Sequence, residues 1–302
     1  MKQATAAALL VAALCTAAAA APKAADAPAP AAPLVPGELT AEQIVEKNVA
    51  ARGGLEAWRR VNTLLFSGHL ESPDAAEPRL PFILEQKRPN KTHFEVTMLG
   101  RKNMRVFDGL HGWKVRAGED GSPEAHPFSV QELKYARNAP GIEGPLIDYA
   151  AHGRTVSLVG TDTFAGHKTY RIAVSSAAGE RNEVWIDAET FLETRFDRTS
   201  YDAKGRPGTV SVWYHDYQLV EGVQIPTVTE IGVGSGKKPD KLVVERIAVN
   251  APLDDREFTQ AGAGHFRHKR IATIDVPVPG QPNVQGGVPM MPAQPDPGAP
   301  QR

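Results

Sequence analysis

Apolar and polar residues alternate with a period of two through most of the chain after residue 80. In the stretch 93–98, Phe94, Val96 and Met98 are apolar, whereas the residues between them are polar. This alternation is typical of a β-strand that buries one face and exposes the other to water. It predicts strands near residues 80–85, 93–98, 103–106, 113–116, 155–160, 169–175, 182–188, 192–198, 209–217, 227–233 and 241–249.

Turn residues such as Asp187 and Gly205 separate these segments. About ten or eleven strands in succession, with few helices, predict a mainly β (α+β) fold built on one large antiparallel sheet. An open sheet of that length curls into a barrel or a half-barrel.

The first helix is predicted to begin after Thr40. Thr40 is a good N-cap, and Gln43 three residues later completes a capping box. The helix should end at Gly53 and Gly54, because glycine is favoured just past a helix C-terminus. Residues 55–61 then read as one or two further helical turns.

A second short helix is predicted from Ser129 to about Arg137. Ser129 and Glu132 have the capping-box spacing, and loops rich in proline and glycine follow. The two short helices are the expected lid of the sheet.

The first strands of the sheet carry apolar residues that are predicted to share one face. In "FDGLHGWKV", residues 107–115, a turn at Asp108 and Gly109 leads to a strand that should point Trp113 inward. The predicted wall consists of Phe82, Leu84, Phe94, Val96, Met98, Met104, Val106 and Trp113.

Two interpretations of this wall remain open. Two short helices cannot cover a sheet of ten strands, and exposed apolar surface costs about 25 cal/mol per Å². Either the sheet closes on itself around an ordinary core, or an apolar ligand or partner fills its concave side.

The N-terminus has the order of a secretory signal. Lys2 precedes an apolar run and then small residues, which predicts a signal peptide over residues 1–20 with cleavage after Ala20. Cys15 would leave with it. The alternative, lipidation of Cys15 in an outer-membrane lipoprotein, is disfavoured because Leu14 stands where a small residue is expected. We therefore predict a periplasmic protein without an integral membrane span.

Composition divides the rest of the chain. Residues 21–38 form a Pro/Ala-rich linker and residues 264–302 a Pro/Gly-rich tail, both predicted to be disordered. The segment 39–263 is long enough for one domain. Without Lys2 the chain has 33 basic and 35 acidic residues, a net charge of −2, which argues against a nucleic-acid partner.

No motif of a hydrolase nucleophile, a phosphate-binding loop or a zinc protease occurs in the sequence. Mature protein without Cys15 has no thiol, and His265 and His268 lie among basic residues that would repel a cation. No metal site and no cofactor are predicted.

Two pairs of residues that could act in catalysis are better explained by a structural role. His215 and Asp216 are adjacent in a predicted strand, so they point to opposite faces and cannot form a relay. Asp187 and Glu189 share a face, but the sequence around them is good turn chemistry between two strands. No catalytic residue is predicted.

An ordered series of segments resembles the LolA-like superfamily, in particular its outer membrane lipoprotein-sorting protein type. The series runs from "EQIVEKNVAARGGLEAWRRVNTLLFSGHL" through "FDGLHGWKV" and "GIEGPLIDYAAHGRTVSLVGTDTFAGHKTYRIAV" to "NEVWIDAETFLETRFDR", "YHDYQLVEGVQIPTVTEI" and "IAVNAPLDDREF". It covers most of Thr40 to Phe258. The resemblance implies an unclosed antiparallel half-barrel with helices as a lid over a cavity for acyl chains.

The predicted function is non-enzymatic: a periplasmic carrier of lipid or lipidated protein. The alternative is an interaction or sensor module of the same fold that has a filled core and binds another envelope protein. Copurified lipid would favour the carrier.

Overall fold

The computed structural model describes residues 39–73, 75, 77–118, 121–201, 206–234, 238–260 and 274–276. The predicted signal peptide, linker and most of the tail lie outside these residues, as do Cys15, His265 and His268.

The helices occupy the predicted places. They are α2 (Ala41–Ala51), α3 (Leu55–Arg60) and α4 (Val130–Asn138), with a short 3₁₀ helix η1 (Asp255–Phe258). The strands are β1 (Thr63–Glu71), β2 (Leu80–Lys87), β3 (Lys91–Met98), β4 (Arg101–Phe107), β5 (Gly112–Ala117), β6 (Pro123–Pro127), β7 (Arg154–Phe164), β8 (His167–Ser176), β9 (Arg181–Asp187), β10 (Glu193–Tyr201), β11 (Pro207–Val220), β12 (Val223–Val233), β13 (Asp240–Val249) and β14 (Ile274–Asp275).

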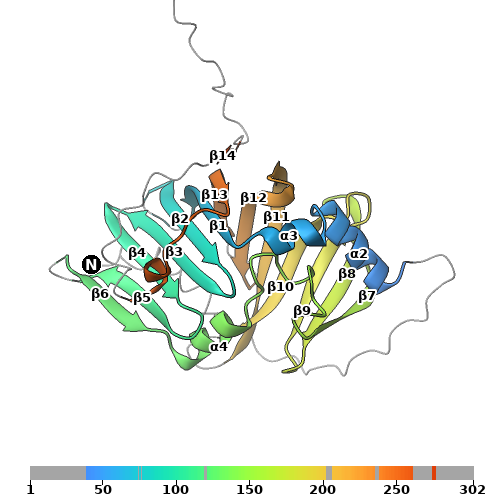
Figure 1. The fold of residues 1–302 in the computed structure, drawn as a ribbon, viewed down its shortest axis with the longest axis horizontal. Coiled ribbons are helices and arrows are strands. Elements are labelled where there is room, and N and C mark those ends of the chain that lie inside the picture. The colour runs from blue at the N-terminus through green and yellow to red at the C-terminus, as the bar shows by residue number, and fades with distance from the viewer. Residues whose placement is uncertain are drawn as a thin grey trace, which may run out of the picture.

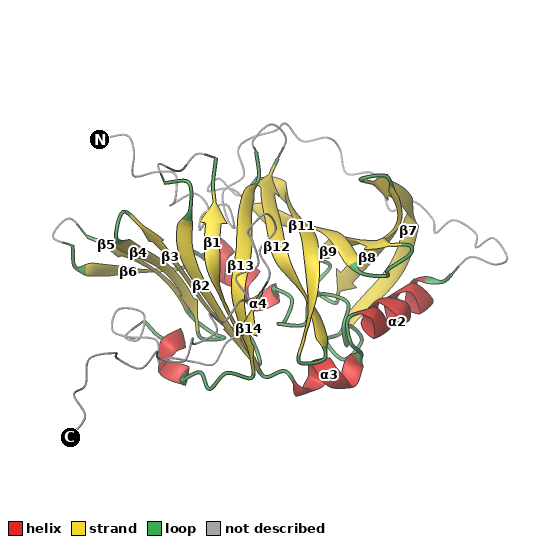
Figure 2. Cartoon of the chain, turned by 90° about the horizontal axis from the view of Figure 1, so that it is seen from above, coloured by secondary structure: helices red, strands yellow, loops and turns green. Residues whose placement is uncertain are grey.

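All strands join one antiparallel sheet in the order β6-β5-β4-β3-β2-β1-β13-β12-β11-β10-β9-β8-β7, with β14 paired to β13. Two meanders, β1–β6 and β7–β13, are therefore joined where β1 pairs with β13. The sheet curves strongly, and its end strands β6 and β7 do not pair (Figures 1 and 2). The predicted unclosed, mainly β half-barrel is confirmed.

The sheet bends where its two meanders meet. The β1–β13 register shifts between Ser67 and Gly68. A side chain at Gly68 would overlap the backbone oxygen of Val243, so glycine allows the two strands to approach here.

Both predicted capping boxes are present. In α2, Gln43 N donates to Thr40 Oγ1 at 3.2 Å, and Thr40 N donates to Gln43 Oε1 at 2.9 Å. In α4, Ser129 and Glu132 make the same reciprocal pair. None of the helices in the described part of the chain is long and apolar enough to cross a membrane.

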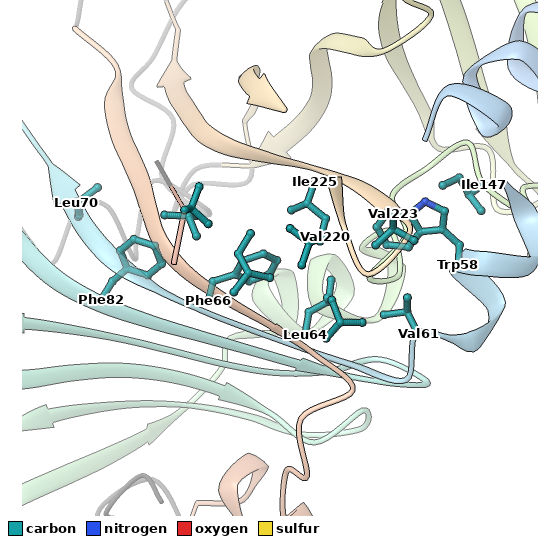
Figure 3. Packing of buried hydrophobic residues seen from close by; sticks show 14 of the residues in the cluster. Trp58, Val61, Leu64, Phe66, Leu70, Phe82, Ile147, Val220, Val223 and Ile225 are labelled. Carbon is teal, nitrogen blue, oxygen red and sulfur yellow. The ribbon is translucent and has the colours of Figure 1, made fainter. Parts of the chain in front are cut away.

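Apolar residues form clusters on both faces of the sheet. The concave face holds one cluster centred on β1, β2 and α3, which includes Trp58, Leu64, Phe66 and Phe82 (Figure 3). A second concave cluster packs β8 and β9 against Ile44 of α2. A third lies on the opposite, convex face, where the C-terminal segment 251–258 covers β1, β4 and β5.

Helix α4 is fixed to the first meander by a buried carboxylate. Glu132 accepts from Arg105 Nη1 at 2.9 Å and from Lys114 Nζ at 3.0 Å, in addition to its capping bond with Ser129. Burial alone would raise the pKa of Glu132, but the Ser129 N–H and the Arg105 charge lower it to about 2.

This pKa predicts a pH-dependent contribution to stability. A carboxyl group whose pKa falls on folding stabilises fully above its unfolded pKa, and the contribution is lost as the pH falls through the folded pKa. We expect Glu132→Gln, which can still cap α4, to lower the free energy of unfolding near pH 7 by up to about 3 kcal/mol. In urea titrations the difference from the unmodified protein should shrink between pH 4.5 and about 2. A difference that stays constant over that range would contradict this role.

Candidate functional site

A cavity of about 340 Å³ lies between the concave face of the sheet and the segment 135–145. This volume is within the range of small-molecule sites. Its walls come from β1, β2 and β9–β13, and Arg52 and Trp58 close one end. Most wall side chains are aliphatic or aromatic: Leu64, Phe66, Phe82, Leu84, Val184, Phe196, Val212, Ile225, Ile231, Leu242 and Val244.

The strand register brings these residues together. Phe66 pairs with Leu84 across β1 and β2, and Val212 pairs with Ile231 across β11 and β12. Directly paired residues point to the same face of a sheet, so side chains that are distant in sequence form one wall.

Two tyrosines reach the cavity because β11 is irregular. Tyr214 and Tyr217 both line it, although residues three apart in a regular strand point to opposite faces. Between them Asp216 has a φ of 51°, a conformation that aspartate tolerates better than most residues. The local distortion interrupts the alternation.

A bulge directs Glu193 toward the same space. The β9–β10 register shifts between Glu193 and Arg195: Glu193 pairs with Ile186, and Arg195 with Trp185. Ile186 belongs to the concave cluster, so Glu193 faces inward. Redirecting a side chain in this way is a common role of a β-bulge.

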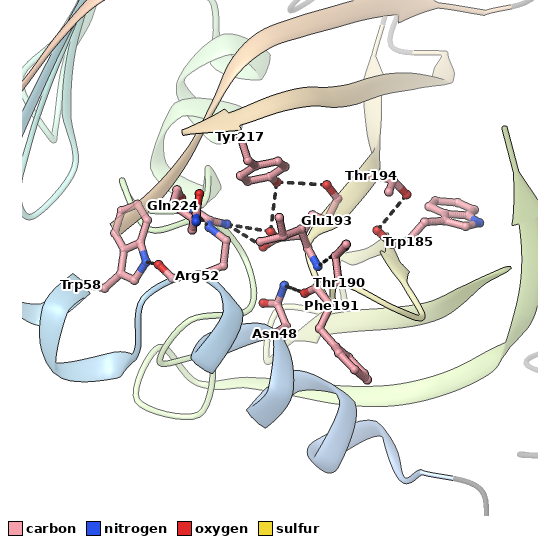
Figure 4. A network of polar contacts seen from close by, with 11 residues as sticks. Asn48, Arg52, Trp58, Trp185, Thr190, Phe191, Glu193, Thr194, Tyr217 and Gln224 are labelled. Carbon is pink, nitrogen blue, oxygen red and sulfur yellow. Dashed lines mark hydrogen bonds and ion pairs between the residues drawn. The ribbon is translucent and has the colours of Figure 1, made fainter. Parts of the chain in front are cut away.

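Arg52, Glu193 and Tyr217 form a buried polar network at the end of the cavity (Figure 4). Arg52 Nη1 donates to both carboxylate oxygens of Glu193, at 2.7 and 2.8 Å. The Tyr217 hydroxyl donates to the backbone oxygen and to Oε2 of Glu193, at 3.0 and 3.2 Å. The three side chains thus stabilise one another within a largely apolar interior.

The network keeps defined protonation states. Burial alone would lower the pKa of Arg52, but the Glu193 charge outweighs it and the pKa is raised. Burial raises the pKa of Tyr217 well above its usual value, and the Glu193 charge adds to the rise. Arg52 is therefore charged and Tyr217 is neutral throughout the physiological range.

Arg52 also anchors the helical lid to the sheet. Its Nε donates to Gln224 O at 2.9 Å, while its backbone oxygen accepts from Gln224 N at 3.0 Å and from Trp58 Nε1 at 2.9 Å. The next residue, Gly53, has a φ of 105°, and a Cβ there would overlap Gly222 O. The α2–α3 corner is therefore tightly packed onto the β11–β12 turn.

Polar contacts also hold the segment 135–145, which covers the cavity on the side opposite the sheet's concave face. Glu143 accepts from His152 Nε2 at 2.8 Å and forms an ion pair with Arg88 at 2.9 Å. Asn90 Nδ2 donates to Ala136 O at 2.9 Å. Each of these bonds to the segment 135–145 involves a side chain, whereas the α2–α3 corner also makes a backbone–backbone bond to β12, from Gln224 N to Arg52 O.

The eight predicted wall residues do not share one face. Phe82 and Leu84 line the cavity, and Phe94, Val96 and Met98 pack with the same concave cluster. The prediction is wrong for the other three. Met104 and Val106 belong to the convex cluster, and Trp113 pairs with Val106 on that side. A ligand-binding role for any of the eight stays a prediction.

Loop length explains this error. Residues 88–90 between β2 and β3 form a three-residue loop, so even-numbered residues pair with even-numbered ones, as Phe82 does with Val96. The β3–β4 loop has two residues, Leu99 and Gly100, which makes Met98 pair with Arg101. Even-numbered residues of β4 therefore point to the other face.

Two of the other candidates, Asp187 and Asp216, make structural contacts. Asp187 Oδ1 accepts from the backbone N–H groups of Glu189 and Thr190, at 3.0 and 2.7 Å, as a turn residue does. Asp216 is exposed, and its backbone oxygen accepts from Thr227 Oγ1. Within the described ranges no cluster of three or more residues could hold a metal ion.

The polar residues of the cavity were missed from sequence because charged residues in strands normally face water. One signal was available for Arg198, which also lines the cavity: it lies two residues after Phe196 and so shares its inward face. Glu193 had no such signal, because its orientation depends on the bulge.

No protein-family model matches the chain, and no curated protein matches its sequence. Solved structures match in fold. A DUF1329 family protein from Desulfovibrio piger is 14% identical, with a TM-score of 0.49 over 74% of this chain and 99% of that one. A LolA superfamily protein from Nitrosomonas europaea is 15% identical, with a TM-score of 0.46 and the same coverage.

A third structure, described as an outer membrane lipoprotein-sorting protein domain from Vibrio parahaemolyticus, is 12% identical. Its TM-score is 0.45 over 72% of this chain and 95% of that one. The LolA-like resemblance predicted from sequence is thus found again as a similarity of fold.

Proposed function

We propose that this protein is a non-enzymatic, periplasmic carrier that binds the acyl chain of a lipid or of a lipidated protein. The observation that supports this most directly is the largely apolar cavity of about 340 Å³ between the concave face of the sheet and the segment 135–145. Burial of each methylene contributes about 0.8 kcal/mol, so an acyl chain can bind there with little directional bonding.

Binding of a neutral apolar dye, N-phenyl-1-naphthylamine, tests the proposal. The dye should fluoresce with the protein and be displaced by straight-chain alcohols. Each added methylene should raise the affinity of the alcohol about fourfold until the cavity is full. Affinity that does not depend on chain length would contradict the proposal.

A variant that fills the cavity should abolish dye binding. Thr229 lines the cavity on β12, paired with Tyr214 and with Leu242, and is only half-buried. Thr229→Trp should therefore fold and weaken dye binding at least about tenfold, because the indole occupies the space that the ligand needs.

The matched control is Glu230→Trp. Glu230 is the next residue of β12 and pairs with Trp213 on the convex side, so the added ring lies outside the cavity. Dye affinity should stay within about twofold. Equal weakening by both variants would show that the dye binds elsewhere. Lack of dye binding by the unmodified protein would favour the interaction or sensor module.

A further inference from the structure

Arg198 is a buried cation without a partner for its terminal nitrogens. Its relative exposure is 5%, and neither Nη1 nor Nη2 has a hydrogen-bond partner among the described residues. None of the ion pairs found in the described ranges includes it. A buried charge that lacks hydrogen bonds is unfavourable, so its presence in an apolar interior calls for an explanation.

The surroundings of Arg198 hold the guanidinium in place without neutralising it. Arg198 pairs with the buried Val210 on β11, and its guanidinium carbon lies 4.1 Å from the ring centre of Tyr135. Stacking on an aromatic ring orients the planar group and leaves its N–H edge available.

Nearby carboxylates are already engaged. Glu193 binds Arg52 and Tyr217, and Glu143 binds Arg88 and His152. These are the two carboxylates that line the cavity, so neither serves as the counterion of Arg198.

Arg198 stands where the cavity meets a second hollow. A groove of about 440 Å³ runs between α4 and the ends of β9 and β10. Tyr135, Pro140, Phe196 and Arg198 line both spaces. The groove is also lined by two more cations, Lys134 and Arg181, and by one carboxylate, Glu180. Its lining therefore carries an excess of positive charge.

We infer that Arg198 binds the anionic group of an amphiphile, a carboxylate or a phosphate, whose chain occupies the apolar cavity. This inference rests on the proposed function and specifies the ligand class. The guanidinium offers two N–H donors to paired oxygens, and such charge-assisted bonds are strong in an apolar site. An acyl chain joined to a protein by an uncharged ester or amide would leave Arg198 unpaired.

Competition against N-phenyl-1-naphthylamine tests the inference. The competitors are dodecanoate, dodecyl phosphate and dodecanol, which share one chain and differ in the head group. Near pH 8 the two anions should bind about tenfold or more tighter than dodecanol. Arg198→Met should remove this preference and leave the affinity for dodecanol unchanged.

Stability provides a second readout. Because methionine fills a similar volume without a charge, the urea midpoint of unliganded Arg198→Met should equal or exceed that of the unmodified protein. The control is Arg195→Met, on the same strand but on the face that pairs with Trp213, and it should keep the preference for anions.

Several results would overturn the inference. Equal affinities for dodecanol and dodecanoate, or a preference that survives in Arg198→Met, would do so while the carrier function stands. Acetate or inorganic phosphate binding as tightly as dodecanoate would indicate a site for small anions instead. Failure of the dye and of dodecanol to bind at all would overturn the proposed function and this inference together.

Discussion

Replacing Arg52 by methionine is expected to lower the free energy of unfolding by about 3 to 5 kcal/mol. The Arg52 and Glu193 side chains are 8% and 3% exposed, and Arg52 contacts both carboxylate oxygens. Without the guanidinium, Glu193 would be a buried charge supported only by Tyr217. Urea unfolding near pH 7 measures the loss.

Two further variants separate the ion pair from the packing around it. Arg52→Met combined with Glu193→Leu should recover most of the loss, because no unpaired charge remains. Arg59→Met, which breaks the half-exposed pair with Asp148, should change the urea midpoint little. A loss of similar size in Arg59→Met and Arg52→Met would contradict a special role for the buried pair.

Local signals in the sequence were sufficient for the helix ends and the turns. Thr40 with Gln43 and Ser129 with Glu132 make their capping bonds within three residues, so no distant part of the chain is needed to predict them. The turn at Asp108 is equally local, because its Oδ1 accepts from Leu110 N and His111 N.

Strand β1 was missed because it does not alternate. Leu64, Leu65 and Phe66 are all buried: Leu64 and Phe66 in the concave cluster, and Leu65 in the convex one. A strand that is covered on both faces reads as a continuous apolar run. The convex cover comes from residues far along the chain, which a window of sequence cannot contain.

To predict the cavity from sequence, the same kind of long-range information would have been needed. Whether Met104 shares a face with Val96 depends on the parity of one loop, and the orientation of Glu193 depends on a bulge. Sequence patterns identified the fold, and five of the eight predicted wall residues lie on its concave side. The orientation of the polar residues on that side depends on the strand register, which hydrophobic patterns in the sequence do not determine.

Replacing Phe258 by alanine is expected to lower the free energy of unfolding by about 3 to 5 kcal/mol. Phe258 is fully buried in η1 and packs on the convex side with Leu65, Met104 and Val106. Removal of its ring would leave a cavity in a cluster that shares no residue with the walls of the apolar site.

The same variant distinguishes the two faces of the sheet. In the fraction that remains folded, Phe258→Ala should bind N-phenyl-1-naphthylamine as tightly as the unmodified protein, because the convex cluster and the cavity lie on opposite sides. Leu110→Ala, which truncates a side chain that is 65% exposed, is the control and should change the urea midpoint little. Weakened dye binding in Phe258→Ala with an unchanged midpoint would place the ligand on the convex side, together with Met104, Val106 and Trp113.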